Sequence, residues 1–363
     1  MRKIPQIQPW IDDSELLYLK KAIDSTYVTE HELTAEFERR ICELTGSKHA
    51  IAMCNGTAAL YCCLKSLGIG EGDEVIVPNF TFIATANSVE MAGATPVFVD
   101  VSPDLQMDVR ECEKKITSKT KAIMPAHIFG FTADMEAICE LATTHNLKVI
   151  EDAAQAIGIK RNGKPCGTFG DAGCFSFFAD KTITMGEGGL VIVKDKDVYD
   201  NLLYLRNQGR KNRGSFLHPE IGYNFRITDI QAAVGLAQLG KLPEIVRKKT
   251  QIFEWYKEGL KDVDEVCIYK PDASTDPFIP FRVVIRTRDK ADKLMSFMSD
   301  AEIETRSFFV PLHQQPCYPD HQGQDYPESV YAYEHGVCLP SYVAIEKEKI
   351  LQVCKTIKEY YHV

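Results

Sequence analysis

The sequence lacks the signatures of a metal-binding or disulfide-bonded protein, although it contains twelve cysteines. No CxxC pair occurs, and no group of cysteines and histidines has the spacing of zinc ligands. The cysteines lie in apolar segments such as 61–64 (YCCL) and 173–175 (GCF), as buried reduced thiols do in cytosolic proteins. We therefore expect no metal site and a cytoplasmic protein.

Long apolar runs and a basic charge excess are also missing. No stretch of 18 apolar residues occurs, and residues 1–5 (MRKIP) lack the apolar core of a signal peptide. The formal net charge of −9 makes the surface a poor general binder of nucleic acid. No G-x-G-x-x-G motif follows the first predicted strand, which disfavours a nucleotide-binding dehydrogenase. Membrane and nucleic-acid partners are therefore not expected.

The length and composition are those of a globular α/β protein with two domains. The chain has 363 residues, of which 45% are hydrophobic and 26% charged. Short apolar strands alternate with helical segments between residues 50 and 193, which predicts a mostly parallel, seven-stranded sheet flanked by helices. Two helices, at 229–239 and 242–260, and a strand at 281–285 follow. We predict a large domain over residues 1–240 and a smaller C-terminal α+β domain over 241–363.

Polar segments follow several of the predicted strands, where open α/β sheets bind their ligands. Residues 54–58 (CNGTA) form a strand–turn–helix junction, which is either a plain turn capped by Thr57 or a phosphate site. Residues 151 and 152 place two carboxylates at a strand end, where they either cap a helix or meet a cationic nitrogen such as a pyridinium.

Lys181 is the most informative lysine of the chain. It follows the aromatic segment 175–178 (FSFF) and precedes residues 186–189 (GEGG). Aromatic neighbours lower the pKa of a lysine and favour the neutral amine that forms an imine, whereas the alternative is a solvated surface lysine. Ser176 offers a hydroxyl for a phosphate. Residues 222–226 (GYNFR) form either a simple turn or an anion-binding loop.

Taken in order, these segments resemble the DegT/DnrJ/EryC1/StrS family of sugar-nucleotide aminotransferases. Members are fold-type I enzymes that use pyridoxal 5'-phosphate (PLP), which alternates with its amino form, PMP. The resemblance runs from residue 4 to residue 340 and is most specific between 55 and 226. It includes the segments 72–78 (GDEVIVP), 94–100 (ATPVFVD), 151–155 (EDAAQ) and 181–189 (KTITMGEGG).

The resemblance implies a role for each matching residue. The lysine in the position of Lys181 forms the Schiff base with PLP and later moves a proton between the cofactor and substrate carbons. Asp152 pairs with the pyridine nitrogen, and Gln155 hydrogen-bonds the ring 3-hydroxyl. The other implied cofactor contacts are the stacking ring of Phe82, which is alternatively a core residue, the phosphate-binding Gly56, Thr57 and Ser176, and Asn224 of the neighbouring subunit. A homodimer with a shared active site is therefore expected.

Within this family, residues 177–189, 221–226 (IGYNFR) and 235–239 (GLAQL) resemble the GDP-perosamine synthase branch. This implies transfer of an amino group from L-glutamate to C4 of GDP-4-keto-6-deoxymannose, on a route to lipopolysaccharide O-antigen or another surface glycan. The alternatives are a C3 or C4 aminotransferase on a UDP- or dTDP-linked keto sugar, and a PLP enzyme of other chemistry. Relatives with His at the Lys181 position are dehydratases. A non-catalytic regulatory relative is disfavoured by the intact Lys181, Asp152 and Gln155.

Three residues are weaker candidates for substrate contacts. His313 lies in residues 310–313 (VPLH), which match a family motif near the substrate. Arg210 belongs to a basic loop, with Arg206 and the cations at 211 and 213, that either meets a diphosphate or is merely solvated. His127 ends the fourth predicted strand, where a structural histidine is equally expected.

Overall fold

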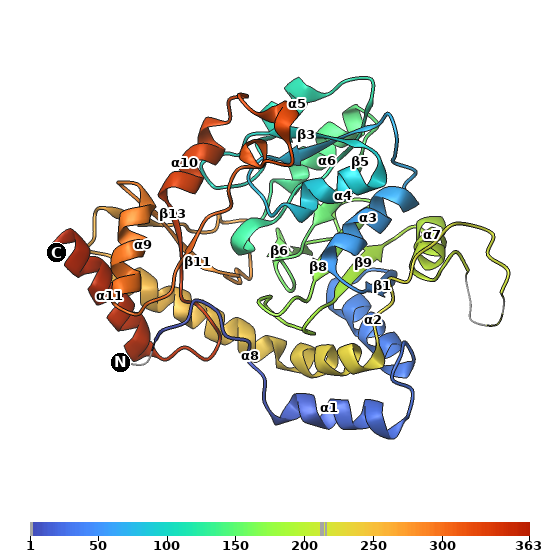
Figure 1. Cartoon of the computed structure of the whole chain (residues 1–363), viewed down its shortest axis with the longest axis horizontal. Helices are drawn as coiled ribbons and strands as arrows, with labels where there is room; N and C mark the ends of the chain where they lie inside the picture. The colour runs from blue at the N-terminus through green and yellow to red at the C-terminus, as the bar shows by residue number, and fades with distance from the viewer. Residues whose placement is uncertain (1–2, 211–213, 215) are drawn as a thin grey trace.

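The computed structural model describes residues 3–210, 214 and 216–363, and its main feature is a seven-stranded sheet (Figure 1). The strands, in spatial order, are β1 (His49–Met53), β9 (Gly189–Val193), β8 (Ala172–Ser176), β5 (Lys148–Asp152), β4 (Thr120–Ile123), β2 (Glu74–Pro78) and β3 (Thr95–Val99). Strand β9 runs antiparallel to both of its neighbours, and the other adjacent pairs are parallel. The predicted mostly parallel sheet is confirmed.

Helices cover both faces of this sheet. One face packs against α3 (Gly56–Ser66), α4 (Ala84–Ala92) and α7 (Lys196–Arg206), and the other against α2 (Glu32–Thr45), α5 (Val109–Lys115), α6 (Met135–Thr144) and the start of α8 (Asp229–Gly259). Successive side chains of a strand point to opposite faces, so Val75 and Val77 join one core cluster while Ile76 joins another. Burial on both faces explains why these strands read as continuous apolar runs.

A second, antiparallel sheet lies in the C-terminal part. Its strands are β10 (Val266–Ile268), β11 (Val283–Thr287), β13 (Gly336–Leu339) and β12 (Arg306–Ser307), in that order, with α9 (Ala291–Asp300), α10 (Pro327–His335) and α11 (Lys347–Tyr361) around them. The strand predicted at 281–285 begins two residues later. The remaining short elements are β6 (Lys160–Arg161), β7 (Lys164–Pro165), and the 3₁₀ turns Ile128–Gly130, Leu312–Gln314 and Pro319–His321.

The two helices predicted on either side of Gly240 are one helix, α8, of 31 residues. It continues through Pro243, although proline removes one hydrogen bond of the helix. Its first half packs on the large sheet through residues such as Leu236, and its second half packs in the C-terminal part through residues such as Tyr256. A continuous helix therefore joins the two parts at the predicted boundary.

Helix α1 (Asp13–Asp24), which packs along α8 (Figure 1), was not among the predicted elements. Its sequence signal is a capping box, in which Asp12 and Glu15 satisfy each other's backbone N–H groups. All twelve cysteines are free thiols. Within the described residues, no helix is long and apolar enough to cross a membrane, and no group of side chains is arranged to hold a metal ion.

Candidate active site

A cavity of about 290 Å³ opens where the carboxyl ends of the parallel strands face the C-terminal part of the chain. Its walls come from strand ends and helix starts of the large sheet, and from Phe281, Arg282, Arg306 and Phe309 of the C-terminal part. Seven predicted cofactor residues line it: Gly56, Thr57, Phe82, Asp152, Gln155, Ser176 and Lys181. The structure thus brings together side chains that are up to 125 residues apart in the sequence.

The two carboxylates at the end of β5, those of Glu151 and Asp152, point in opposite directions. Because neighbouring side chains of β5 point to opposite faces, Asp152 faces the cavity while Glu151 is buried behind it. Glu151 accepts hydrogen bonds from the backbone N–H groups of Gly167, Phe169 and Gly170. It therefore holds the loop that precedes β8, and only Asp152 is available to a ligand.

Asp152 is buried and fixed in direction. The hydroxyl of Thr85, on α4, donates to Asp152 Oδ2 at 2.7 Å, and the N–H of Ala154 donates to Oδ1 at 3.2 Å. Donors of this kind stabilise the ionised carboxylate. A buried carboxylate that faces a cavity suits a cationic partner, such as a protonated ring nitrogen.

Gln155 is oriented by the backbone of the segment after β4. The N–H of Phe129 donates to Gln155 Oε1 at 2.7 Å. Phe129 has a φ of 58°, which is unusual for an aromatic residue and aims this N–H at the side chain. Because the amide oxygen is occupied, the amide nitrogen of Gln155 is left to donate to a ligand oxygen in the cavity.

The start of α3 forms a cradle for an anion. Asn55 caps the helix by accepting from the N–H of Ala58, while the N–H groups of Gly56 and Thr57 precede the first intrahelical bonds. Gly56 approaches the end of β8 so closely that an added Cβ would lie 3.1 Å from Cβ of Ser176. Helix N–H groups beside a hydroxyl form a ready site for a phosphate.

Lys181 lies in the loop between β8 and β9. Its Nζ is 4.9 Å from the centre of the Phe281 ring. Burial lowers the pKa of Lys181 below its usual range, whereas the carboxylates of Asp180 and Asp152 act in the opposite direction. The net effect favours the neutral amine, which is the form that attacks a carbonyl carbon.

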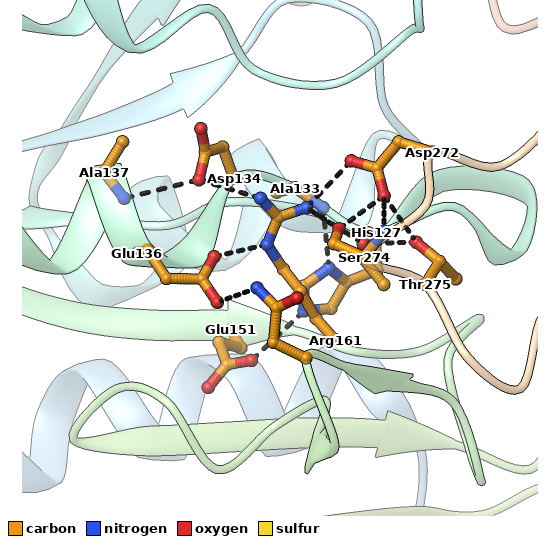
Figure 2. A network of polar contacts seen from close by, with 12 residues as sticks. His127, Ala133, Asp134, Glu136, Ala137, Glu151, Arg161, Asp272, Ser274 and Thr275 are labelled. Atoms are coloured by element: carbon orange, nitrogen blue, oxygen red, sulfur yellow. Dashed lines mark hydrogen bonds and ion pairs between the residues drawn. The ribbon is translucent and has the colours of Figure 1, made fainter.

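His127 lines the cavity, but both of its ring nitrogens are bonded within the protein (Figure 2). Nδ1 accepts from the N–H of Ala133 at 3.2 Å, so Nε2 carries the proton and donates to Glu151 at 3.1 Å. The ring is fully buried. This bonding favours the structural alternative for His127 over a substrate contact.

Asn224, His313 and Arg210 do not line the cavity of their own chain. Asn224 is exposed and pairs through its backbone with Asn207, as is possible for a residue that serves a neighbouring subunit. His313 is buried, and its Nδ1 lies 2.9 Å from the amide nitrogen of Asn79. The guanidinium of Arg210 lies 5.7 Å from the ring of Phe216.

The proposed basic loop is smaller than the sequence indicates. Arg206 is buried at the end of α7, where it forms ion pairs with Glu30 and Glu38 and donates to the carbonyl of Ala52. It is therefore structural. The cations at 211 and 213 lie outside the described residues.

Sequence reasoning missed several residues that shape the cavity. Thr85 is the second residue of α4, three positions after Phe82, and its hydroxyl reaches Asp152. Arg282, Arg306 and Phe309 carry no local motif, because they reach the cavity only through the packing of the C-terminal part.

These features fit PLP. The carboxylate of Asp152, the amide nitrogen of Gln155, the anion cradle at Gly56 and the amine of Lys181 match its ring nitrogen, hydroxyl, phosphate and aldehyde. The ring of Phe82, with 53% of its surface exposed, provides the flat apolar face that an aromatic cofactor needs.

Comparisons with known proteins agree with this geometry. A relative from Escherichia coli O157:H7 named GDP-perosamine synthase is 41% identical over 366 residues, which cover 99% of each chain. A UDP-N-acetyl-3-dehydro-alpha-D-glucosamine 3-aminotransferase from Acidithiobacillus ferrooxidans is 37% identical over 90% of this chain and 88% of its own length. The solved structure of Spr1654 from Streptococcus pneumoniae in its PLP form matches 99% of both chains, with a TM-score of 0.93 and 26% identity.

The family model that matches spans residues 9–358 and describes the DegT/DnrJ/EryC1/StrS aminotransferases. The matched range includes every residue of the cavity wall described above. The chain therefore belongs to the DegT/DnrJ/EryC1/StrS aminotransferase family.

Proposed function

We propose that this protein is a PLP-dependent aminotransferase that moves the amino group of L-glutamate to C4 of GDP-4-keto-6-deoxymannose. The observation that carries the proposal is one cavity in which a buried lysine of lowered pKa, a fixed carboxylate and an oriented amide converge. The choice of sugar is supported by the full-length similarity to the relative named GDP-perosamine synthase.

When bound, PLP supplies an electron sink for negative charge at the carbon that carries the amino group. Asp152, with Thr85 behind it, holds a protonated ring nitrogen in place. The cradle at Gly56 and Ser176 would hold the phosphate of the cofactor. Lys181 holds and releases the proton at Nζ, a task for which a lowered pKa is suited.

The same proposal includes a homodimer. Helix α1 and its flanking residues expose large apolar side chains: Ile11, Leu16, Leu17, Ile23, Tyr27 and Val28. Apolar surface gathered in this way is typical of an interface. Asn224 is exposed outside the cavity of its own chain, which supports a contact with the phosphate bound by the other subunit.

We infer further that the enzyme works in the cytoplasm and supplies an amino sugar for a surface glycan such as O-antigen. The free thiols at all twelve cysteines support a reducing compartment. The glycan rests on the resemblance to perosamine-forming enzymes.

A UDP-linked keto sugar aminated at C3 is the second candidate substrate, and the relative from Acidithiobacillus ferrooxidans is the observation that favours it. Both candidates use the same residues around the cofactor. They differ in the base and in the carbon that receives the amino group.

The test is a turnover assay on purified holoenzyme with GDP-4-keto-6-deoxymannose and L-glutamate, with 2-oxoglutarate as the measured product. We expect robust turnover, and its complete loss in Lys181→Ala. The control Lys194→Ala removes a lysine that donates to the carbonyl of Thr168 and does not line the cavity. Full activity of Lys181→Ala would overturn the assignment. Glutamate consumption without turnover of this sugar would favour the UDP- or dTDP-linked substrates.

A further inference from the structure

Two kinds of contact hold the loop that carries Lys181. Ile183 and Met185 of this loop are packed in the core of the large sheet. Lys181 and Thr184, in contrast, border a second, smaller cavity of about 30 Å³, which Gln238 also lines. A residue that borders a cavity makes fewer packing contacts, so hydrogen bonds contribute more to its placement.

Thr184 ties this loop both to the end of β8 and to α8. Its hydroxyl donates to the carbonyl of Phe177 at 3.3 Å and accepts from the N–H of Gly186 at 2.9 Å. Its backbone N–H donates to Oε1 of Gln238, on α8, at 3.3 Å. Because Thr184 is only three residues from Lys181, a contact that fixes Thr184 also limits the movement of the lysine backbone.

The amide of Gln238 is buried and fixed in its orientation. Its Nε2 donates to the carbonyl of Trp10 at 2.8 Å and to Oε1 of Glu15 at 2.7 Å. Since the nitrogen has two acceptors, the amide oxygen is the atom that faces Thr184. Glu15 belongs to α1, which lies along α8 (Figure 1). One amide therefore connects α1 to the loop that carries Lys181.

Glu15 is a buried carboxylate whose bonds keep it in place. Its side chain forms an ion pair with Lys241 at 2.6 Å and accepts from the N–H of Asp12 at 2.8 Å. A buried charge with such partners is tolerated. Neither Glu15 nor Gln238 lines the active-site cavity, so both act on that cavity only through the loop.

We propose that Gln238 is a positioning residue, which links α1 to the loop at Thr184 and holds Lys181 where its amine reaches the aldehyde carbon of PLP. This inference rests on the proposed function, in which Lys181 forms an imine with PLP. In that step Nζ bonds to the aldehyde carbon, and the aldehyde oxygen leaves as water. Loss of the link should weaken formation of this bond and leave the contacts to the ring and the phosphate intact.

The experiment compares the binding of two ligands to apo-protein by calorimetric titration. PLP forms the imine, whereas pyridoxine 5'-phosphate has a hydroxymethyl group in place of the aldehyde and binds through its ring and phosphate alone. Gln238→Leu keeps a similar volume and removes the amide. We expect it to weaken PLP binding about tenfold and to change the binding of pyridoxine 5'-phosphate less than about twofold.

The other end of the link is tested at Glu15. Glu15→Leu removes one acceptor of the Gln238 amide and should weaken PLP binding selectively, by a smaller factor than Gln238→Leu. Glu15→Gln keeps an acceptor oxygen and should bind PLP within about twofold of wild type. Tyr256→Phe is the matched control, because it removes a buried hydrogen bond to the carbonyl of Pro340 from the other half of α8. It should change the affinity for neither ligand.

Unchanged PLP affinity in Gln238→Leu would overturn the proposal, and so would an equal loss for both ligands, which would indicate general damage to the site. If Gln238→Leu fails to fold, the comparison of Glu15→Leu with Glu15→Gln decides by the same criterion. A wild-type protein that binds the two ligands equally would contradict the role of Lys181 in the proposed function, and this inference with it. That failure is distinguishable because it appears without any substitution.

Discussion

Thr85 acts on the proposed cofactor site through its hydrogen bond to Asp152. Its hydroxyl donates to Asp152 at 2.7 Å, and a hydrogen bond to a charged group contributes about 1.5–3 kcal/mol. Thr85→Val keeps the shape and removes the donor, so we expect PLP to bind at least about tenfold more weakly.

The measurement is the dissociation constant of PLP from apo-protein. Thr85→Ser, which keeps a hydroxyl, should restore tight binding. Thr356→Val removes a hydroxyl that donates to the carbonyl of Gln352 in α11, far from the cavity, and should not change the dissociation constant. Equal effects of the two valine variants would show that Thr85 has no specific role.

Lys249 is a buried cation with no carboxylate bonded to it. Its ammonium donates to the carbonyls of Phe281 and Ser341 at 3.0 and 2.9 Å, and burial lowers its pKa to about 7. The unfolded chain keeps the ordinary, higher pKa and therefore binds more protons above pH 7. Below the folded-state pKa, the buried ammonium of Lys249 lowers the free energy of unfolding by its full amount. This loss of stability becomes smaller as the pH rises toward the unfolded-state pKa.

We therefore expect the wild-type protein to gain stability over Lys249→Met by about 1.4 kcal/mol per pH unit between about pH 7 and pH 9. Urea denaturation of both proteins at several pH values measures the difference, in which all other titrating groups cancel. A difference that does not change with pH would contradict the lowered pKa of Lys249.

At the scale of elements, one arginine joins segments from both parts of the chain (Figure 2). Arg161 of β6 forms ion pairs with Asp134 and Glu136 at the start of α6, and with Asp272 in the loop that follows β10. Only 9% of its side chain is exposed, whereas its partners remain about half exposed. Arg161 also donates to the hydroxyl of Thr132, next to Ala133, whose N–H donates to His127 in the cavity wall.

Arg161→Met should lower the free energy of unfolding by about 2 kcal/mol, because it leaves several polar groups without their shared donor. Urea denaturation is the measurement. Arg110→Met, which removes an arginine that is 83% exposed and paired with Asp108, should change stability by less than about 0.5 kcal/mol. Equal losses of stability in the two variants would mean that the Arg161 network contributes no more to stability than an ordinary exposed ion pair.

Two elements show where local patterns were misleading. Helices were predicted at 229–239 and 242–260 with a boundary at Gly240, but α8 is continuous because its two halves pack in separate cores. Tertiary burial outweighs the low helix propensity of Gly240 and Pro243. In contrast, α1 carries a capping box but buries little apolar surface within its own chain. Its apolar residues therefore lack the spacing that predicts a helix packed on a core.

At the scale of the whole molecule, the proposed dimer makes activity depend on the exposed face of α1. Leu17, with 66% of its surface exposed, is the most exposed of these apolar side chains. Leu17→Asp should dissociate the dimer and abolish turnover, because each cavity would lose Asn224 of the other subunit. Light scattering with size-exclusion chromatography gives the mass, and the glutamate assay gives the activity. Leu351→Asp, at an exposed leucine of α11, should leave both unchanged. A monomeric and fully active Leu17→Asp variant would refute the shared site.

The sequence by itself determined the sheet and the residues at its carboxyl edge. Apolar strands alternating with helices require a parallel sheet, and such a sheet collects the residues after its strands at one edge, so Gly56, Asp152 and Lys181 converge. Only the tertiary structure decided what surrounds them. Whether the ring of His127 or of His313 contacts a ligand depends on how the surrounding backbone packs, because that packing decides whether each ring faces the cavity. Arg306 reaches the cavity through a different sheet, and no local pattern encodes a contact between side chains so distant in the sequence.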